Sequence, residues 1–187
     1  MLHISISEEV ATACPDLHVL VLSCDVCNSE PDERLWQEIA DEEKAVRETV
    51  KLEQINKWLP IQATRQAYKR LGKDPNRYRP SSEALRRRIL RELPLYKVDT
   101  LVDLINLVSI RSGYSIGGFD ADKIAGGSLV LGVGREGEVY HGIGRGELNI
   151  AGLPVYRDAV CGVGTPTSDE ERTKIGLDTT RLLMIIN

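Results

Sequence analysis

The sequence lacks any run of about 18 consecutive apolar residues, the length that a membrane-spanning helix requires. Its first residues, 1–5, also lack the charged region followed by an apolar region that marks a secretory signal. At 187 residues and 42% hydrophobic content, the chain is long enough to bury one substantial core. We therefore predict a cytoplasmic protein with no membrane contact, folded as one domain over residues 1–187.

Cysteine is scarce, which excludes a fold held together by disulfides. The cysteines are Cys14, Cys24, Cys27 and Cys161. Cys24 and Cys27 have the C-x-x-C spacing of a redox pair or of half a zinc site, but zinc needs two further ligands. The nearby His3 and His18 lie in or beside apolar runs that are typical of buried strands. The sequence therefore predicts reduced thiols, no metal and no cofactor.

Common catalytic motifs are absent too, because the chain contains neither G-x-S-x-G nor H-E-x-x-H. His141 stands alone on an expected strand, which is more typical of a bystander than of a general base. Gly142, Gly144 and Gly146 suggest a phosphate loop, but residues 147–150 look like a strand where such a loop needs a helix. Turn glycines are the favoured interpretation, and an anion-binding nest is the alternative.

Positive charge, by contrast, is concentrated in one segment, residues 65–91. It holds ten basic and two acidic residues, and its +8 leaves the rest of the chain at −12 within a net charge of −4. A local basic patch on an acidic protein indicates an anionic partner at one face, with nucleic acid as the leading candidate. A merely solvated basic face is the alternative.

The arginines of this segment should not all serve one ligand. Residues 86–88 are consecutive arginines that point in directions about 100° apart on a helix. Arg88 lies beside the apolar stripe of that helix, so we expect it to form an ion pair or cap a carbonyl. Arg87 and Arg91 share a face because they are four residues apart. The predicted RNA contacts are Arg77, Arg79, Arg87 and Arg91.

Hydrophobic periodicity and turn residues predict strands, then helices, then strands. The first part has strands at 2–5 and 17–25 around a short helix at 7–13. The expected helices are 32–58, as one helix or two shorter ones, 60–72, 82–93 and 100–112, where Thr100 and Asp103 have the spacing of a capping box. The expected later strands are 128–133, 138–143, 153–157 and 181–186, the last pairing centrally in a sheet. This order indicates an α+β fold.

A polar cluster at residues 165–173 lies between two apolar strands and combines hydroxyls, carboxylates and a guanidinium. Such a loop can hold a carboxylate that activates water and an arginine that binds a phosphate or carboxylate. A solvated turn with a salt bridge is an equal alternative.

Several motifs resemble one family. They are Ala67-Tyr68, Pro80-Ser81-Ser82-Glu83-Ala84-Leu85, Arg87-Arg88, Val102-Asp103-Leu104-Ile105-Asn106, Ile116-Gly117-Gly118-Phe119-Asp120-Ala121-Asp122-Lys123-Ile124, Glu171-Arg172-Thr173-Lys174-Ile175 and Thr179-Thr180. From about Thr64 onward, in this order, the chain is similar to the B3/B4 domain, the editing and tRNA-associated module of the bacterial phenylalanyl-tRNA synthetase β subunit. The resemblance covers residues 61–187, after an N-terminal part, 1–60, of strands and a long helix.

The resemblance implies mostly antiparallel, sandwich-like β-sheets with several helices packed on one side. It also implies an aminoacyl-ester pocket where helices and sheet meet, since the family module removes tyrosine wrongly attached to the phenylalanine tRNA. Where the family pattern has a histidine two residues before the Phe-Asp pair, this chain has Gly117, so that substrate contact is missing. The family's editing carboxylate would fall within residues 168–171.

The candidate site residues follow from the resemblance and the polar cluster. The candidate catalytic residues are Asp169 and Glu170. The candidate pocket residues are Asn106, Gly117, Gly118, Asp120, Arg157, Thr165, Ser168 and Arg172. Three hypotheses remain open: a hydrolase that edits mischarged aminoacyl-tRNA in trans, a non-catalytic tRNA or RNA binding module, and a sensor that binds a free amino acid.

Overall fold

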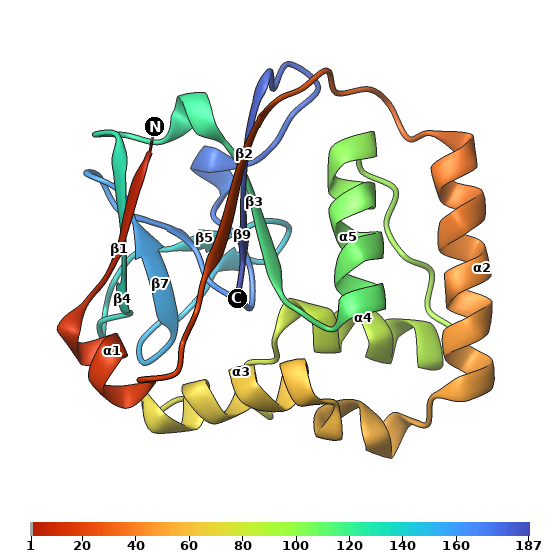
Figure 1. Ribbon diagram of the computed structural model, residues 1–187, viewed down its shortest axis with the longest axis horizontal. Helices are drawn as coiled ribbons and strands as arrows, with labels where there is room; N and C mark the ends of the chain where they lie inside the picture. The colour runs from red at the N-terminus through yellow and green to blue at the C-terminus, as the bar shows by residue number, and fades with distance from the viewer. Residues whose placement is uncertain (1) are drawn as a thin grey trace.

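Two larger β-sheets, a two-stranded hairpin and a group of helices make up the computed structural model, which describes residues 2–187 (Figure 1). The helices are α1 (Glu8–Ala13), α2 (Glu33–Thr49), α3 (Leu59–Arg70), α4 (Ser81–Leu90) and α5 (Thr100–Ser112), with 3-10 turns η1 (Leu52–Lys57), η2 (Ala121–Lys123) and η3 (Glu171–Thr173). The strands are β1 (His3–Ile6), β2 (Leu20–Asp25), β3 (Ile116–Asp120), β4 (Ser128–Val133), β5 (His141–Gly142), β6 (Gly146–Glu147), β7 (Pro154–Arg157), β8 (Gly162–Gly164) and β9 (Arg181–Ile186).

The two larger sheets face each other across one apolar core. One has the strand order β1-β4-β7-β8, in which β1 runs parallel to β4 and the other pairs are antiparallel. The other has the order β2-β9-β3 and is wholly antiparallel. Leu129, Leu131 and Tyr156 from the first sheet pack in one cluster with Phe119 and Leu183 from the second. This arrangement confirms the predicted α+β fold with sandwich-like, mostly antiparallel sheets.

Strand β9 lies at the centre of its sheet, as predicted from its apolar sequence. It pairs with β2 along one edge and with β3 along the other. Both faces of β9 are covered, since Leu182 packs in the cluster under α5 and Leu183 packs in the core between the sheets. A strand buried on both faces needs consecutive apolar residues rather than alternating ones.

The helices α2, α4 and α5 gather beside the β2-β9-β3 sheet, and α3 runs along the end of the sandwich (Figure 1). Leu101 and Ile105 of α5 pack on that sheet, while Ile110 of α5 packs with Val46 of α2 and Ile89 of α4. The prediction of helices on one side of the sheets is therefore confirmed.

Local capping explains where α5 begins and ends. The side chain of Asp99 accepts a hydrogen bond from the Val102 amide at 2.9 Å, which satisfies a free donor of the first turn. Gly113 ends the helix at a φ of 81°, a conformation that favours glycine. The expected capping box of Thr100 and Asp103 is wrong, because Asp99 is the N-cap and the Asp103 carboxylate accepts hydrogen bonds from the Val98 amide, just before that cap, and from Trp36.

Several expected boundaries change in the structure. The helical pattern at 32–58 is divided into α2 and η1, and the strand expected at 17–25 begins at Leu20. The strand expected at 138–143 shrinks to β5, which forms a two-stranded hairpin with β6. Gly144 and Gly146 have φ angles of 65° and 70° in that hairpin, so they are turn glycines and no phosphate loop forms.

No helix within residues 2–187 is both long and apolar enough to span a bilayer. In the same range, no three His, Cys, Asp or Glu side chains gather closely enough to hold a metal ion, and the four cysteines are free thiols.

Candidate functional site

A cleft of about 810 Å³ opens between α2, α4, α5 and the β5–β6 hairpin. Six arginines line it, and we name it the arginine cleft after them. They are Arg77, Arg79, Arg87, Arg88, Arg91 and Arg145. Five of them belong to the basic segment found in the sequence, so that segment does line a concave surface.

The other walls of the arginine cleft are aromatic and polar. Trp36 and the largely exposed Tyr96 contribute rings, while Asn106 and Ser168 contribute hydrogen-bonding groups. Asp103 is the one carboxylate among the lining residues. Its oxygens accept hydrogen bonds from Trp36 Nε1 at 2.6 Å and from the Val98 amide at 3.1 Å, and burial raises its pKa. The cleft therefore presents a strongly positive surface.

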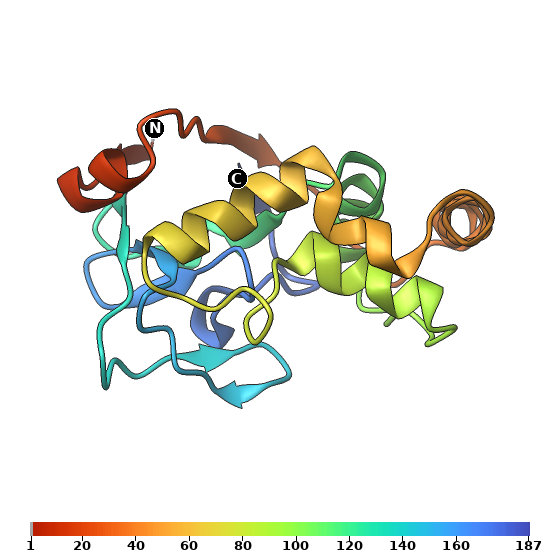
Figure 2. The same ribbon diagram turned by 90° about the horizontal axis from the view of Figure 1, so that it is seen from below.

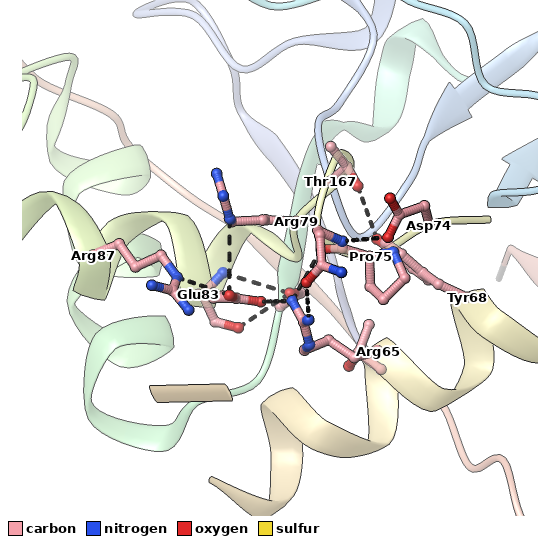
Figure 3. Close-up of polar contacts among 12 residues, drawn as sticks. Arg65, Tyr68, Asp74, Pro75, Arg79, Glu83, Arg87 and Thr167 are labelled. Atoms are coloured by element: carbon pink, nitrogen blue, oxygen red, sulfur yellow. Dashed lines mark hydrogen bonds and ion pairs between the residues drawn. The ribbon is translucent and has the colours of Figure 1, made fainter. Parts of the chain in front are cut away.

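Behind the cleft, Glu83 of α4 is fully buried and binds three arginines, which we name the Glu83 cluster (Figure 3). Its carboxylate lies 2.8 Å from Arg65 Nη1, 2.8 Å from Arg87 Nε and 3.9 Å from Arg79 Nε. Arg65 is itself nearly buried and donates further hydrogen bonds to loop 74–79, at the Pro75 carbonyl and the Asn76 side chain. The cluster joins α3, that loop and α4.

The basic segment divides into residues that serve the fold and residues that face solvent. Arg86 stacks 3.6 Å above the Trp58 ring and donates to the Ile110 carbonyl, so it turns inward. Arg88 caps the Pro94 carbonyl and lies 4.2 Å above the Tyr96 ring, which confirms its predicted structural role. Arg86 and Arg88 are therefore engaged with the protein itself.

Arg77, Arg91 and Arg145 are different, because they are exposed and form no ion pair with any described residue. Arg145 lies in the turn of the β5–β6 hairpin. It is not among the RNA contacts predicted from the sequence, because it is far from the basic segment. The signal that pointed to it was the glycine cluster around it, which suggested an anion nest. These three guanidiniums are the ones most available to a ligand.

The loop 165–168 forms a wall between helices and sheet, and it is ordered rather than a solvated turn. Thr165 and Thr167 are buried, and the Thr165 hydroxyl accepts hydrogen bonds from the Thr167 and Ser168 amides, each at 3.1 Å. The Tyr140 hydroxyl donates to the Ser168 carbonyl at 2.7 Å. The hydroxyl groups of Tyr68 and Thr167 hydrogen bond at 2.9 Å. The loop therefore holds Ser168 at the cleft.

Asp169 follows this loop and lies among apolar and glycine residues. One of its oxygens accepts the Gly118 amide at 3.1 Å. The other faces Gly117 and Gly164, where a Cβ atom would stand 3.3 and 2.9 Å from it. Burial raises the pKa of Asp169 to about 7, although the Gly118 hydrogen bond opposes the shift. No described cation lies within ion-pair distance, so this carboxyl can exchange a proton near neutral pH.

Glu170 has a different environment from its neighbour. It is buried, its carboxylate accepts the Arg172 amide at 2.7 Å, and that contact caps η3. His141 Nδ1 lies 3.9 Å from its other oxygen. Glu170 is thus engaged in holding the start of η3.

The predicted pocket residues separate into three places. Asn106 and Ser168 line the arginine cleft, whereas Gly117 and Gly118 lie beside Asp169. The three charged residues of the predicted pocket lie elsewhere, and each contacts a different partner. Asp120 accepts from the Thr179 hydroxyl and pairs with Lys123, Arg157 pairs with Glu138, and Arg172 pairs with Asp158.

Comparison with protein families agrees with the resemblance seen in the sequence. The family model of the B3/4 domain matches residues 63–187. A solved structure, an N-terminal fragment of the phenylalanyl-tRNA synthetase β subunit from Pyrococcus horikoshii, is similar at 13% identity with a TM-score of 0.47. That likeness covers 98% of this chain and 42% of the fragment. The comparison with curated proteins found no match. Since the family model matches more than half of its residues, the chain belongs to the B3/4 domain family.

Proposed function

We propose that the arginine cleft binds RNA, and specifically the acceptor end of a tRNA. The observation that supports this most strongly is the gathering of Arg77, Arg91 and Arg145, exposed and without ion pairs among the described residues, in one cleft of about 810 Å³. Such guanidiniums neutralise phosphates, and their convergence from a loop, a helix end and a hairpin suits a chain of phosphates rather than a single anion.

The aromatic wall favours nucleic acid over other polyanions. Tyr96 is 70% exposed, and Arg88 lies over one face of its ring. An exposed ring beside guanidiniums is a typical stacking surface for an unpaired base. The family's association with tRNA synthetases supports tRNA as the source of that RNA, and its unpaired acceptor end fits a cleft that combines stacking and phosphate contacts.

The test is a titration of tRNA and of a single-stranded oligonucleotide at several salt concentrations. The triple variant Arg77→Gln, Arg91→Gln, Arg145→Gln should reduce the slope of log affinity against log salt by about two to three, because three phosphate contacts are lost. The matched control replaces Lys44, Lys57 and Lys69 with glutamine. These exposed lysines lie outside the cleft, so the same loss of charge should leave most of the slope in place.

Equal effects of the two triple variants would reject the cleft as the RNA site. Tighter binding to heparin than to RNA of equal charge would reject nucleic acid as the ligand.

A second function, hydrolysis of mischarged aminoacyl-tRNA, is favoured by Asp169. A carboxyl with a pKa of about 7 is suited to take a proton from water that attacks an ester. Asp169 directly follows Ser168, which lines the cleft, and one of its oxygens faces Gly117 and Gly164 beside the ring of Phe119. We prefer it to Glu170 as the base, because Glu170 is engaged in capping η3.

Deacylation of a panel of mischarged tRNAs tests this activity. The rate with the wild-type protein should rise with pH through about 7, as Asp169 loses its proton, and Asp169→Asn should remove the acceleration. Binding of uncharged tRNA should survive in that variant. If no charged tRNA in the panel loses its amino acid faster, the hydrolase is excluded while the RNA-binding proposal stands.

A further inference from the structure

A second cavity, of about 400 Å³, lies away from the arginine cleft, between α1, α3 and the ends of β4, β7 and β9. We name it the α1–α3 cavity. In Figure 2, the N-terminal segment with α1 lies along one side of α3 and the β5–β6 hairpin along the other. The cavity and the cleft share no lining residue. They are therefore separate sites whose ligands can be tested separately.

One wall of this cavity is outside the family match. The segment 10–18 closes it over α3, whereas the family model begins at residue 63. The cavity therefore depends on the N-terminal part of this chain.

Small side chains leave the space open. Ala63 and Ala67 of α3 face the cavity one turn apart, and Pro60, Pro154 and Pro166 line it where longer side chains would fill it. Val10, Leu17, Leu71 and Leu131 complete a mostly apolar lining. A cavity of this size and polarity matches the sites that hold small organic molecules in proteins.

One cation is available to a ligand at this cavity. Arg70 lies one turn beyond Ala67 and also lines it. Its guanidinium donates one hydrogen bond, from Nη1 to the Ala13 carbonyl at 3.3 Å, and it forms no ion pair with any described residue. The remaining donors of its planar fork suit a carboxylate. His18 also lines the cavity and adds positive charge when protonated.

Asp16 is the opposing charge, since it is exposed and lines the same cavity. It lowers the affinity for an anion without occupying the Arg70 fork, because the two residues form no ion pair. If the ligand is an anion, removing the Asp16 charge should therefore strengthen its binding.

We propose that the α1–α3 cavity binds a small organic acid, with an apolar body against Ala63, Ala67 and Leu131 and a carboxylate on Arg70. The geometry requires a single carboxylate at one end of a body about the size of a phenyl ring or a branched aliphatic chain. This inference does not depend on the RNA-binding proposal, because it concerns a different cavity with different residues.

Calorimetric titration of the full chain with three probes tests the proposal. The probes are phenylacetate, its neutral analogue 2-phenylacetamide and its cationic analogue phenethylamine. Phenylacetate should bind with a dissociation constant of about 1 mM, as expected for a ligand of its size, and more tightly than either analogue. Equal affinity for the acid and the amide would overturn the assignment of the carboxylate, and no binding of any probe would overturn the site.

Variants locate the ligand. Arg70→Gln should weaken phenylacetate binding about tenfold by removing a charge-assisted contact, while Lys69→Gln, the neighbouring exposed cation outside the cavity, should not change it. Asp16→Asn should strengthen binding about twofold. Ala63→Leu, at an exposed position of α3 that tolerates a larger side chain, should fill the cavity and abolish binding.

Unchanged binding in Arg70→Gln or in Ala63→Leu would reject the cavity. Loss of binding in the Arg77, Arg91 and Arg145 triple variant would place the acid in the arginine cleft instead and also reject it.

Discussion

Two carboxylates withdrawn from solvent, Glu83 and Asp169, have opposite surroundings. Glu83 is fully buried and receives Arg65 and Arg87 at 2.8 Å, with Arg79 further away. Asp169 receives one backbone amide, that of Gly118, and no described cation. Glu83 is therefore fully buried with cations that compensate its charge, whereas Asp169 is half-buried and has a single backbone hydrogen bond.

The difference separates a structural carboxylate from a chemically available one. A buried charge that is paired and hydrogen-bonded holds its neighbours firmly, and removing one partner leaves the others uncompensated. A buried carboxyl without a cation keeps its proton up to higher pH, which is the condition that general acid–base chemistry uses. Glu83 thus belongs to the joint between α3 and α4, and Asp169 is the residue to test for chemistry.

The largest expected effect comes from breaking the Glu83 cluster. Glu83→Ala should lower the free energy of unfolding by about 3–5 kcal/mol, because the buried Arg65 then loses its carboxylate. Urea denaturation followed by circular dichroism measures the change.

Glu43→Ala is the matched control for that experiment, since it breaks the pair of the half-buried Glu43 with the exposed Arg47 on α2. Its cost should be about 0.3–0.5 kcal/mol, the usual value for a helical surface pair. Similar costs in the two variants would mean that burial does not distinguish the Glu83 cluster.

Asp169→Asn should have the opposite sign, and its effect should depend on pH. Burial raises the pKa of the Asp169 carboxyl in the folded protein to about 7, so the folded state disfavours the ionised carboxylate. Stability from this group is full below the unfolded pKa of about 4 and is lost as pH rises to about 7. Asparagine carries no charge, so the variant should match the wild type near pH 4 and exceed it by about 4 kcal/mol at pH 8, because a pKa raised by roughly three corresponds to about 1.4 kcal/mol for each unit.

Denaturation curves of the variant and the wild type at each of the two pH values measure that difference. The titration of all other groups is the same in both proteins and therefore cancels. Asp25→Asn, at an exposed position of β2, is the control, because it replaces a carboxylate that is not buried. A pH-independent effect of Asp169→Asn would show that its carboxyl titrates normally.

The sequence predicted the elements whose signals are local and missed those that depend on tertiary contacts. The helices and β9 follow from apolar spacing and from turn residues. Strands β3 and β8 contain Gly117, Gly118, Gly162 and Gly164, which carry no side-chain pattern, so their pairing with β9 and β7 decides their structure.

The same limit applies to the candidate site. The sequence showed the basic segment and the polar loop, but Glu83 was one of two acids within the segment and nothing local showed that it is buried. The separation of Asp169 from Glu170 depends on the glycines and the ring of Phe119 around Asp169, which come from β3 and β8. Arg145 joins the cleft only because the β5–β6 hairpin brings it there.

The smallest effect concerns two arginines that line the same cleft, Arg88 and Arg91. The Arg88 guanidinium contacts the Pro94 carbonyl and the Tyr96 ring, so Arg88 resembles Glu83 in having partners within the protein. The Arg91 side chain has no partner among the described residues. Arg88→Gln should therefore lower the free energy of unfolding by about 1 kcal/mol, the usual value of one such contact. Arg91→Gln should stay within about 0.5 kcal/mol of the wild type but reduce the salt dependence of RNA binding by about one phosphate contact. Urea denaturation and RNA titration of the two variants show whether each guanidinium serves the fold or the ligand. A stability loss in Arg91→Gln together with a reduced salt dependence in Arg88→Gln would contradict the distinction drawn from their contacts.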